Sequence, residues 1–206
     1  MKLIQARPKI IIGVFFALAA WLIFIFIALT WFQNTYVHSF TFNNPQFLKS
    51  SYTEKWFTSL LGQLPPKRSE ARVIQLWQPD CLCNRFARPH ALKAMELSKE
   101  LGYEHLTLIP KGEKSTIQQL QTLNPNTQVL EIPPKILETW PSSPSVLIEG
   151  NNQQLMYIGP LGFGTFCNQA TTSAIDSQLS GIANGVSRPF YNQIGQGCFC
   201  SWDSSK

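Results

Sequence analysis

The first strong pattern along the chain is an apolar run at residues 10–32, which contains no charged residue. A helix rises 1.5 Å per residue, so this run would extend about 34 Å and span a hydrocarbon core about 30 Å thick. Three Lys and Arg residues precede the run, and none follows it until Lys49. By the positive-inside rule, this distribution predicts that residues 1–9 lie in the cytoplasm and that the chain after residue 32 lies across the membrane.

A cleaved signal peptide is the alternative interpretation of this run, because Ala17-Leu18-Ala19 offers a site of the small-x-small type. The apolar region of a cleavable signal is only about 7 to 15 residues long. The run here continues well past Ala19, which favours an uncleaved anchor.

Residues 33–69 are predicted to form a tether that leads into a short helix. The segment begins with polar and aromatic residues, and residues 46–61 have an amphipathic pattern. Pro65 and Pro66 then end this element, because proline cannot continue a helix.

Residues 73–109 have the pattern strand, helix, strand. Residues 73–77 are apolar and rich in β-formers, residues 84–101 alternate apolar and charged positions before Gly102, and residues 105–109 form a second apolar run. This order predicts two parallel strands joined by a helix.

The remaining chain predicts a hairpin and two further helices. The apolar runs at residues 145–149 and 155–158 are separated by a polar turn, which favours a β-hairpin. The other segments are assigned as a helix at 115–123, an irregular, proline-broken passage at 129–140, a helix at 167–183 and a C-terminal tail at 186–206.

The charge of the chain gives no indication of a nucleic-acid partner. The net charge is +5, but three of the 17 Lys and Arg residues precede the apolar run, which leaves 14 against 12 Asp and Glu. The part after the run is long enough for one domain with its own core.

The five cysteines are the candidate chemistry. Four of them form two Cys-x-Cys pairs, Cys81 with Cys83 and Cys198 with Cys200, and Cys167 is the fifth. Disulfides form and persist outside a bacterial inner membrane, so the predicted topology suits thiol chemistry.

The chain from about residue 70 to 185 resembles the thioredoxin-like superfamily at named residues. Trp77 stands four residues before Cys81, and Pro89 stands eight residues after it within the predicted helix. Ser143-Pro144, followed by the hairpin, is similar to the cis-proline segment of that superfamily. The whole chain also resembles an uncharacterised group of bacterial membrane-anchored thioredoxin-like proteins.

The resemblance implies an α/β fold, in which a central mixed sheet is flanked by helices, preceded here by one transmembrane helix. It also implies that Cys81 and Cys83 are catalytic, and that Trp77, Ser143 and Pro144 form the surrounding site, with Pro144 in the cis form. No cofactor is expected, because thiol–disulfide exchange needs only the sulfurs.

The chain departs from the superfamily at the cysteines themselves. One residue instead of two separates Cys81 from Cys83, and Asn84 stands where the second cysteine is expected. Residues i and i+2 of a helix project about 200° apart, so Cys81 must precede the helix if it is to bond Cys83. The resulting ring would be small and strained, which favours an oxidising pair in which Cys81 attacks and Cys83 resolves.

The other cysteines leave alternatives open. Cys198 and Cys200 form either a second redox pair, which passes electrons to the first, or static disulfides that fasten the tail. Cys167 is interpreted as a small buried residue.

Two other classes of function compete with an enzyme. Four thiolates could hold Cu(I), which prefers soft sulfur ligands. Alternatively, the protein is a scaffold that keeps the fold without turnover. His38, His90 and His105 are interpreted as surface or interface residues, and no metal ligand is assigned.

The sequence therefore predicts a thiol–disulfide oxidoreductase in the bacterial inner membrane, with a single span at residues 10–32 and its domain in the periplasm. Its expected partners are protein or small-molecule thiols and disulfides.

Overall fold

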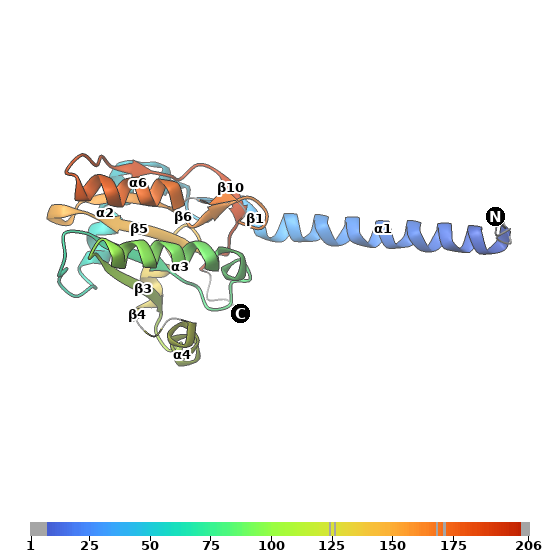
Figure 1. The fold of residues 1–206 in the computed structure, drawn as a ribbon, viewed down its shortest axis with the longest axis horizontal. Coiled ribbons are helices and arrows are strands. Elements are labelled where there is room, and N and C mark those ends of the chain that lie inside the picture. Colours follow the sequence, from blue (N-terminus) through green and yellow to red (C-terminus); the bar gives the residue numbers. More distant parts are fainter. Residues whose placement is uncertain (1–7, 124, 126, 168, 171, 203–206) are drawn as a thin grey trace. The chain divides into compact units, whose positions relative to one another are not determined.

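The structure is a computed structural model that describes residues 8–123, 125, 127–167, 169, 170 and 172–202. The chain divides into two units, Met1–Thr35 and Tyr36–Lys206. The first contains the long helix α1 (Pro8–Tyr36), and the second is the domain that holds all five cysteines (Figure 1).

Helix α1 exposes large apolar side chains along its length. Phe15, Phe24 and Phe26, for example, have exposed fractions of 68%, 70% and 71%. Its segment Ile11–Tyr36 contains 26 residues and is long and apolar enough to cross a membrane. The helix predicted at residues 10–32 is confirmed, and it continues to Tyr36.

The domain is built on a six-stranded mixed sheet with the order β4-β3-β2-β5-β6-β9. Strand β2 pairs in parallel with β3 and antiparallel with β5, and the hairpin partners β5 and β6 are antiparallel. The strands are β2 (Arg72–Leu76), β3 (Glu104–Pro110), β4 (Gln128–Ile132), β5 (Ser145–Glu149), β6 (Leu155–Pro160) and β9 (Phe190–Tyr191).

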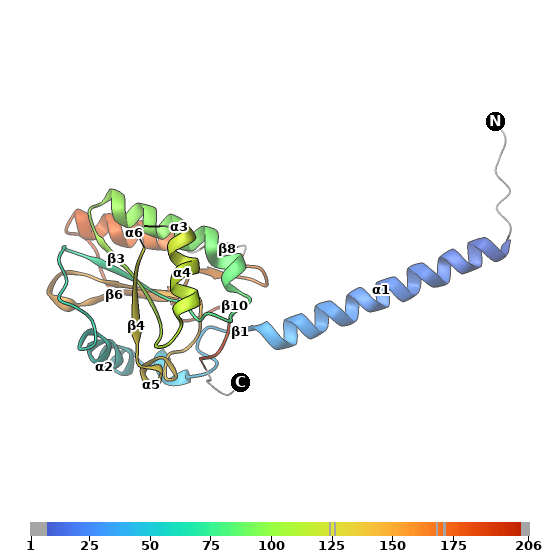
Figure 2. The same ribbon diagram turned by 90° about the horizontal axis from the view of Figure 1, so that it is seen from below.

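Helices cover both faces of the sheet (Figure 2). Helices α3 (Asn84–Glu100) and α6 (Thr172–Ala183) lie on one face, and α2 (Ser50–Leu61) and α5 (Pro134–Leu137) lie on the other. Helix α4 (Lys114–Leu123) connects β3 to β4. The β2–α3–β3 unit, followed by the β5–β6 hairpin and α6, is a thioredoxin-like arrangement, so the predicted fold class is confirmed.

Strand β2 is central because both of its faces are covered. All five of its residues are buried. Ile74 and Leu76 belong to the core that also includes Phe57 and Leu60 of α2. Gln75, on the opposite face, donates a hydrogen bond from Nε2 to the carbonyl of Ala91 in α3 at 2.9 Å. Both faces of β2 are therefore buried, although Arg72 and Gln75 interrupt its apolar residues.

A buried charge cluster fixes the register where β2 begins. Arg72, only 1% exposed, lies 2.8 Å from a carboxylate oxygen of Glu104 in β3 and 3.5 Å from one of Glu149 in β5. Burial raises the pKa of Glu149, and the charge of Arg72 opposes this rise. The cluster therefore ties β2 to its two neighbours at the end of the sheet remote from the cysteines.

The prediction of an irregular passage at residues 129–140 was wrong, because this passage contains strand β4 and the short helix α5. The strand pairs in parallel with β3 over Gln128–Ile132 and is followed by Pro133. It lies at the edge of the sheet, where only one neighbour covers it. Its residues are mostly exposed or half-buried, so the apolar periodicity is weak.

Much of the segment predicted as a tether is part of the core. Strand β1 (Val37–Ser39) and the 3-10 helix η1 (Pro45–Leu48) precede α2, which is the expected lead-in helix. Phe40 and Phe47 are completely buried and pack edge-to-face against Trp140. Only the bounds of the tether change, because residues 37–61 belong to the folded domain.

The C-terminal segment is also packed into the domain. Strand β10 (Gln196–Cys198) pairs antiparallel with β1, and Phe199, which is 1% exposed, packs edge-to-face against Phe40. The remaining short elements are η2 (Asn151–Gln153), β7 (Gly162–Phe163) and β8 (Gln169–Ala170). Phe199 and Trp202 of this segment therefore belong to the core.

Replacing Phe199 with alanine tests this packing. We expect the free energy of unfolding to fall by about 3–5 kcal/mol, because a buried aromatic side chain is removed and a cavity remains. Ile194→Ala is the matched control, since Ile194 is 86% exposed, and it should change stability by less than about 0.5 kcal/mol. Urea unfolding of the full chain in detergent, followed by tryptophan fluorescence, gives both values. Equal effects of the two substitutions would show that the segment is not packed.

Candidate functional site

The first Cys-x-Cys pair lies in the turn between β2 and α3. The backbone N–H of Cys81 donates to the carbonyl of Gln78 at 3.2 Å, and Nδ2 of Asn84 donates to the same carbonyl at 2.6 Å. Helix α3 begins at Asn84, and Cys83 is its N-cap residue. Cys81 therefore precedes the helix, as the sequence requires, and Asn84 closes the turn instead of supplying a sulfur.

The Ser143–Pro144 segment lies against this turn. The peptide bond between these residues is cis, so that prediction is confirmed. The hydroxyl of Ser143 accepts a hydrogen bond from the backbone N–H of Gln78 at 3.0 Å and lies 3.4 Å from the carbonyl oxygen of Leu76. The carbonyl oxygen of Ser143 lies 3.6 Å from Sγ of Cys81. Ser143 thus joins the cis-proline segment to the cysteine turn.

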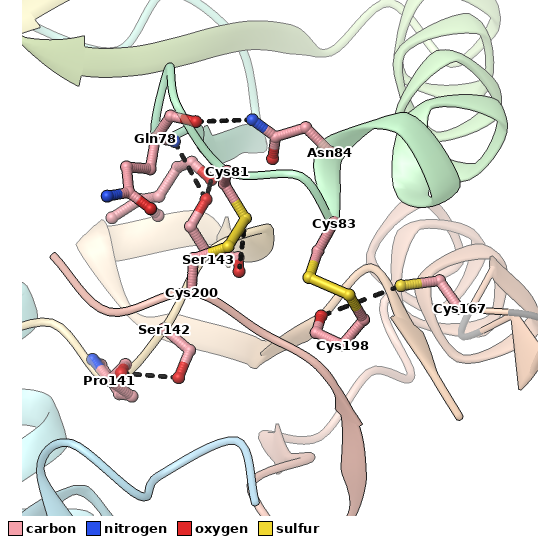
Figure 3. The surroundings of a disulfide bond; sticks show 11 residues. Gln78, Cys81, Cys83, Asn84, Pro141, Ser142, Ser143, Cys167, Cys198 and Cys200 are labelled. Atoms are coloured by element: carbon pink, nitrogen blue, oxygen red, sulfur yellow. Dashed lines mark hydrogen bonds between the residues drawn. A yellow bond between two sulfur atoms is a disulfide. The ribbon is translucent and has the colours of Figure 1, made fainter. Parts of the chain in front are cut away.

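The structure pairs the cysteines differently from the sequence prediction. Cys81 is bonded to Cys200, and Cys83 is bonded to Cys198 (Figure 3). The expected bond between Cys81 and Cys83 is therefore wrong for this state of the protein. The prediction of a small, strained ring is therefore also wrong, because the two bonds join residues 119 and 115 positions apart.

Backbone hydrogen bonds hold Cys200 at the site independently of its sulfur. The N–H of Cys200 donates to the carbonyl of Ser143 at 2.9 Å, and the N–H of Ser143 donates to the carbonyl of Cys200 at 3.0 Å. These two bonds form an isolated antiparallel bridge. The C-terminal segment therefore adds a short extended partner beside the cis-proline.

The sulfurs form a tight cluster. The Sγ atoms of Cys81, Cys83 and Cys200 all lie within 4.8 Å of one another. Cys83 and Cys198 are fully buried and Cys81 is 5% exposed, whereas Cys200 is half-buried. The bond between Cys81 and Cys200 is consequently the outer disulfide, and the bond between Cys83 and Cys198 is the inner disulfide.

Cys167 is a buried free thiol next to the inner disulfide, as predicted. Its S–H group points at the carbonyl oxygen of Cys198, with the sulfur 3.9 Å away (Figure 3). A ring nitrogen of His90 lies 2.8 Å from the carbonyl oxygen of Cys167. Burial raises the pKa of the Cys167 thiol to about 11, and the hydrogen bond to Cys198 partly offsets the rise.

Three other residues considered in the sequence lie in different parts of the domain: Trp77 follows β2, His38 is in β1 and His105 is in β3. Trp77 is 9% exposed and, with Ala91 and Leu92 of α3, lines a small cavity of about 30 Å³. His38 stacks on Phe42 in the segment after β1. Both ring nitrogens of His105 are buried without a hydrogen-bond partner among the described residues, and burial lowers the pKa of this histidine to about 4.

A recess of about 280 Å³ adjoins the cysteine turn. Gln78 and Asp80 line it from the turn, Lys111 lines it from the loop after β3, and Trp202 lines it from the C-terminal segment. Oε1 of Gln78 and Nε1 of Trp202 are buried without a partner in the described part of the chain. Gln78 and Trp202 therefore place residues close in sequence to Cys81 and Cys200 on the wall of the recess.

The partnership of the two Cys-x-Cys pairs is what the sequence interpretation missed. The pairs share the same spacing, and antiparallel alignment of two such segments matches Cys81 with Cys200 and Cys83 with Cys198. On the extended C-terminal segment, side chains two positions apart share a face, so Cys198 and Cys200 both face the cysteine turn. The equal spacing of the two Cys-x-Cys pairs was the feature of the sequence that could have indicated this pairing.

The comparisons with known proteins agree with the fold. Residues 53–202 match the family described as Domain of unknown function (DUF6436). A search of curated proteins found no match. A hypothetical protein from Sinorhizobium meliloti 1021 superposes with a TM-score of 0.51 at 12% identity, over 66% of this chain and 82% of that one, which shows a shared fold.

Two further solved structures are more distant. An uncharacterized conserved protein from Geobacillus kaustophilus has a TM-score of 0.44 at 15% identity, over 68% of this chain and 81% of that one. A secreted Mycobacterium tuberculosis disulfide oxidoreductase, homologous to E. coli DsbE, has a TM-score of 0.41 at 13% identity, over 54% of this chain and 81% of that one.

Single substitutions test the disulfide pairing. In Cys81→Ser the newly free thiol should be Cys200, and in Cys83→Ser it should be Cys198, because each loses the bonded partner. Alkylation of the denatured, unreduced protein, followed by fragmentation mass spectrometry, identifies the labelled sulfur. Labelling of Cys83 in the Cys81→Ser variant would establish the pair that the sequence predicted.

The pKa of Cys167 predicts its reactivity in the folded protein. With a pKa of about 11, only about one thiol in a thousand is ionised at pH 8, and the thiolate is the reactive form. Alkylation by iodoacetamide should therefore be slow and should accelerate about tenfold per pH unit from pH 8 to 10. Peptide mass spectrometry of timed samples measures the rate, with denatured protein as the reference. Equal rates in the folded and denatured protein at pH 8 would contradict the burial of this thiol.

Proposed function

This chain belongs to the DUF6436 family, and from its cysteine cluster we propose that it is a membrane-anchored thiol–disulfide oxidoreductase. The observation that carries the proposal is the position of Cys81. It lies at the start of α3 beside the cis-proline, bonded to Cys200, with the sulfur of Cys83 within 4.8 Å.

The outer disulfide is the bond that exchanges with a substrate. Cys200 is the more exposed of its two sulfurs, so a substrate thiolate attacks Sγ of Cys200. The bond between Cys81 and Cys200 breaks, a mixed disulfide forms at Cys200, and Cys81 leaves as a thiolate. The helix dipole favours an anion at the start of α3, which makes Cys81 the better leaving group.

A second substrate thiolate completes the reaction. It attacks the substrate sulfur of the mixed disulfide and releases Cys200 as a thiolate. The substrate gains a disulfide, and the protein gains two electrons and two protons. In the opposite direction the same steps run backwards: the Cys200 thiolate attacks a substrate disulfide, and the Cys81 thiolate then attacks Cys200 in the mixed disulfide and releases the substrate thiolate. Cys200 therefore replaces Cys83 as the redox partner of Cys81.

The inner disulfide is a second redox pair that exchanges through the first. Once the outer bond is reduced, the thiolate of Cys81 or Cys200 lies within 4.8 Å of Sγ of Cys83. Attack there forms a new bond to Cys83 and releases Cys198 as a thiolate. The other outer thiolate then attacks the outer sulfur of this new bond and releases Cys83 as a thiolate. The bond between Cys81 and Cys200 is thereby re-formed, and the buried pair is reduced without direct contact with a substrate.

The localisation of the site follows from the anchor and the disulfides. The positively charged residues that precede residues 10–32 support a cytoplasmic N-terminus in a bacterial inner membrane. Two disulfides suit an oxidising compartment, which supports a periplasmic domain. The substrates are then thiols or disulfides of the periplasm, and the recess beside Gln78 and Trp202 receives the part of the substrate next to its reacting sulfur.

A redox titration tests the function. The full chain in detergent is equilibrated in dithiothreitol buffers of graded potential, and free thiols are counted by mass after alkylation. We expect a reversible two-electron transition at Cys81 and Cys200, followed by a second at Cys83 and Cys198 in more reducing buffers, because the inner pair is fully buried.

Variants separate an enzyme from a static cross-link. Cys81→Ser should abolish exchange with a model dithiol and leave the fold intact, whereas Cys167→Ser, the matched control, should exchange at the wild-type rate. Disulfides that resist reduction until the domain unfolds would show that the cysteines only fasten the C-terminal segment.

A further inference from the structure

We propose that the fully reduced protein binds one Cu(I) ion through the thiolates of Cys81, Cys83 and Cys200. In the residues that the structure describes, the sulfurs of these three cysteines form the one group of candidate metal ligands whose atoms all lie within 4.8 Å of one another. The proposal goes beyond the exchange reaction, because it concerns the state in which no disulfide is present.

Reduction leaves the C-terminal segment in place because contacts other than the disulfides hold it. Cys200 is bonded through its backbone to Ser143 in both directions. Phe199 is buried in the core, and Trp202 is 6% exposed. On the other side of the cysteines, β10 pairs with β1. Noncovalent packing therefore holds the chain on both sides of Cys198 and Cys200 and keeps their sulfurs near α3.

The spacing of the three sulfurs suits a single ion. Three sulfurs in a plane around a metal at a bond length of about 2.3 Å lie about 4 Å from one another. Cys83 already lies within 4.8 Å of the other two sulfurs. Cys81 and Cys200 have only to separate from their bonded distance, which reduction allows.

The chemistry of the ligands selects the metal. Thiolates are soft ligands and favour Cu(I) or zinc over harder cations. A structural zinc site needs four ligands in tetrahedral geometry. The fourth cysteine of the two pairs, Cys198, is outside the group of three sulfurs. Three ligands in one place are therefore better suited to Cu(I), for which a trigonal thiolate site is sufficient.

The surroundings also favour a bound cation. Two of the three sulfurs belong to residues that are at most 5% exposed, namely Cys81 and Cys83. Several thiolates packed together in a buried place repel one another, so reduction alone leaves most of them protonated. A cation relieves this repulsion as the thiols lose their protons, and the start of α3 stabilises the negative charge that remains.

A Cu(I) titration of the reduced full chain tests the site. The protein in detergent is reduced with a phosphine, freed of reductant under anaerobic conditions, and titrated with Cu(I) against the chromophoric chelator bicinchoninate. We expect one tightly held ion per chain, and X-ray absorption should find three sulfur ligands at about 2.3 Å. Because the thiols must lose protons to bind, the affinity should fall as the pH is lowered.

Serine variants identify the ligands. Cys81→Ser, Cys83→Ser and Cys200→Ser should each weaken binding by more than the roughly 10- to 100-fold that the loss of a second-sphere partner costs. Cys198→Ser and Cys167→Ser are the matched controls and should bind with wild-type affinity. Circular dichroism of each reduced variant verifies that the fold is intact.

Three results would overturn the proposal. They are the failure of the reduced protein to compete with the chelator, a loss of affinity in Cys198→Ser equal to that in Cys83→Ser, and preferential binding of zinc by all four cysteines. The redox titration is carried out without metal. Its outcome therefore tests the exchange reaction independently of the binding of Cu(I).

Discussion

The docking of the C-terminal segment against the start of the domain is the contact on which the site depends. The β1–β10 pairing, the buried ring of Phe199 and the backbone bridge between Ser143 and Cys200 bring two sulfurs to the first turn of α3. Without this contact, Cys81 would have only Cys83 nearby, which is two positions further along the chain. The disulfides report an arrangement that noncovalent packing already specifies.

The sheet supplies the other half of the site. The cysteine turn follows β2 and the cis-proline precedes β5, and these two strands are antiparallel neighbours. The two segments therefore meet at the same end of the sheet, where Ser143 bonds to Gln78. The buried ion cluster around Arg72 fixes the opposite end of the same strands. Register set by charge at one end thus determines how the sulfur chemistry is placed at the other.

The elements with strong local sequence patterns were predicted from the sequence. The β2–α3–β3 unit, the β5–β6 hairpin and the helix α1 all have strong periodicity or composition, and the motif around Ser143 and Pro144 indicated the cis bond. Long-range contacts were not predictable in this way. Whether residues 37–39 pair with residues 196–198 depends on a meeting of the two ends of the domain, and three-residue strands have no detectable period. The partner of Cys81 depends on that meeting, so it was missed.

The distance along the chain between the two Cys-x-Cys pairs determines when the sulfur cluster can form. Synthesis proceeds from the N-terminus, so Cys81 and Cys83 are made more than a hundred residues before their partners. The sheet can largely assemble during that interval, but the sulfur cluster can close only after Cys198 and Cys200 have also been synthesised. A chain truncated before Cys198 would keep the strands from β2 to β6 and lose both disulfides, so the sulfur cluster requires the segment that follows β9.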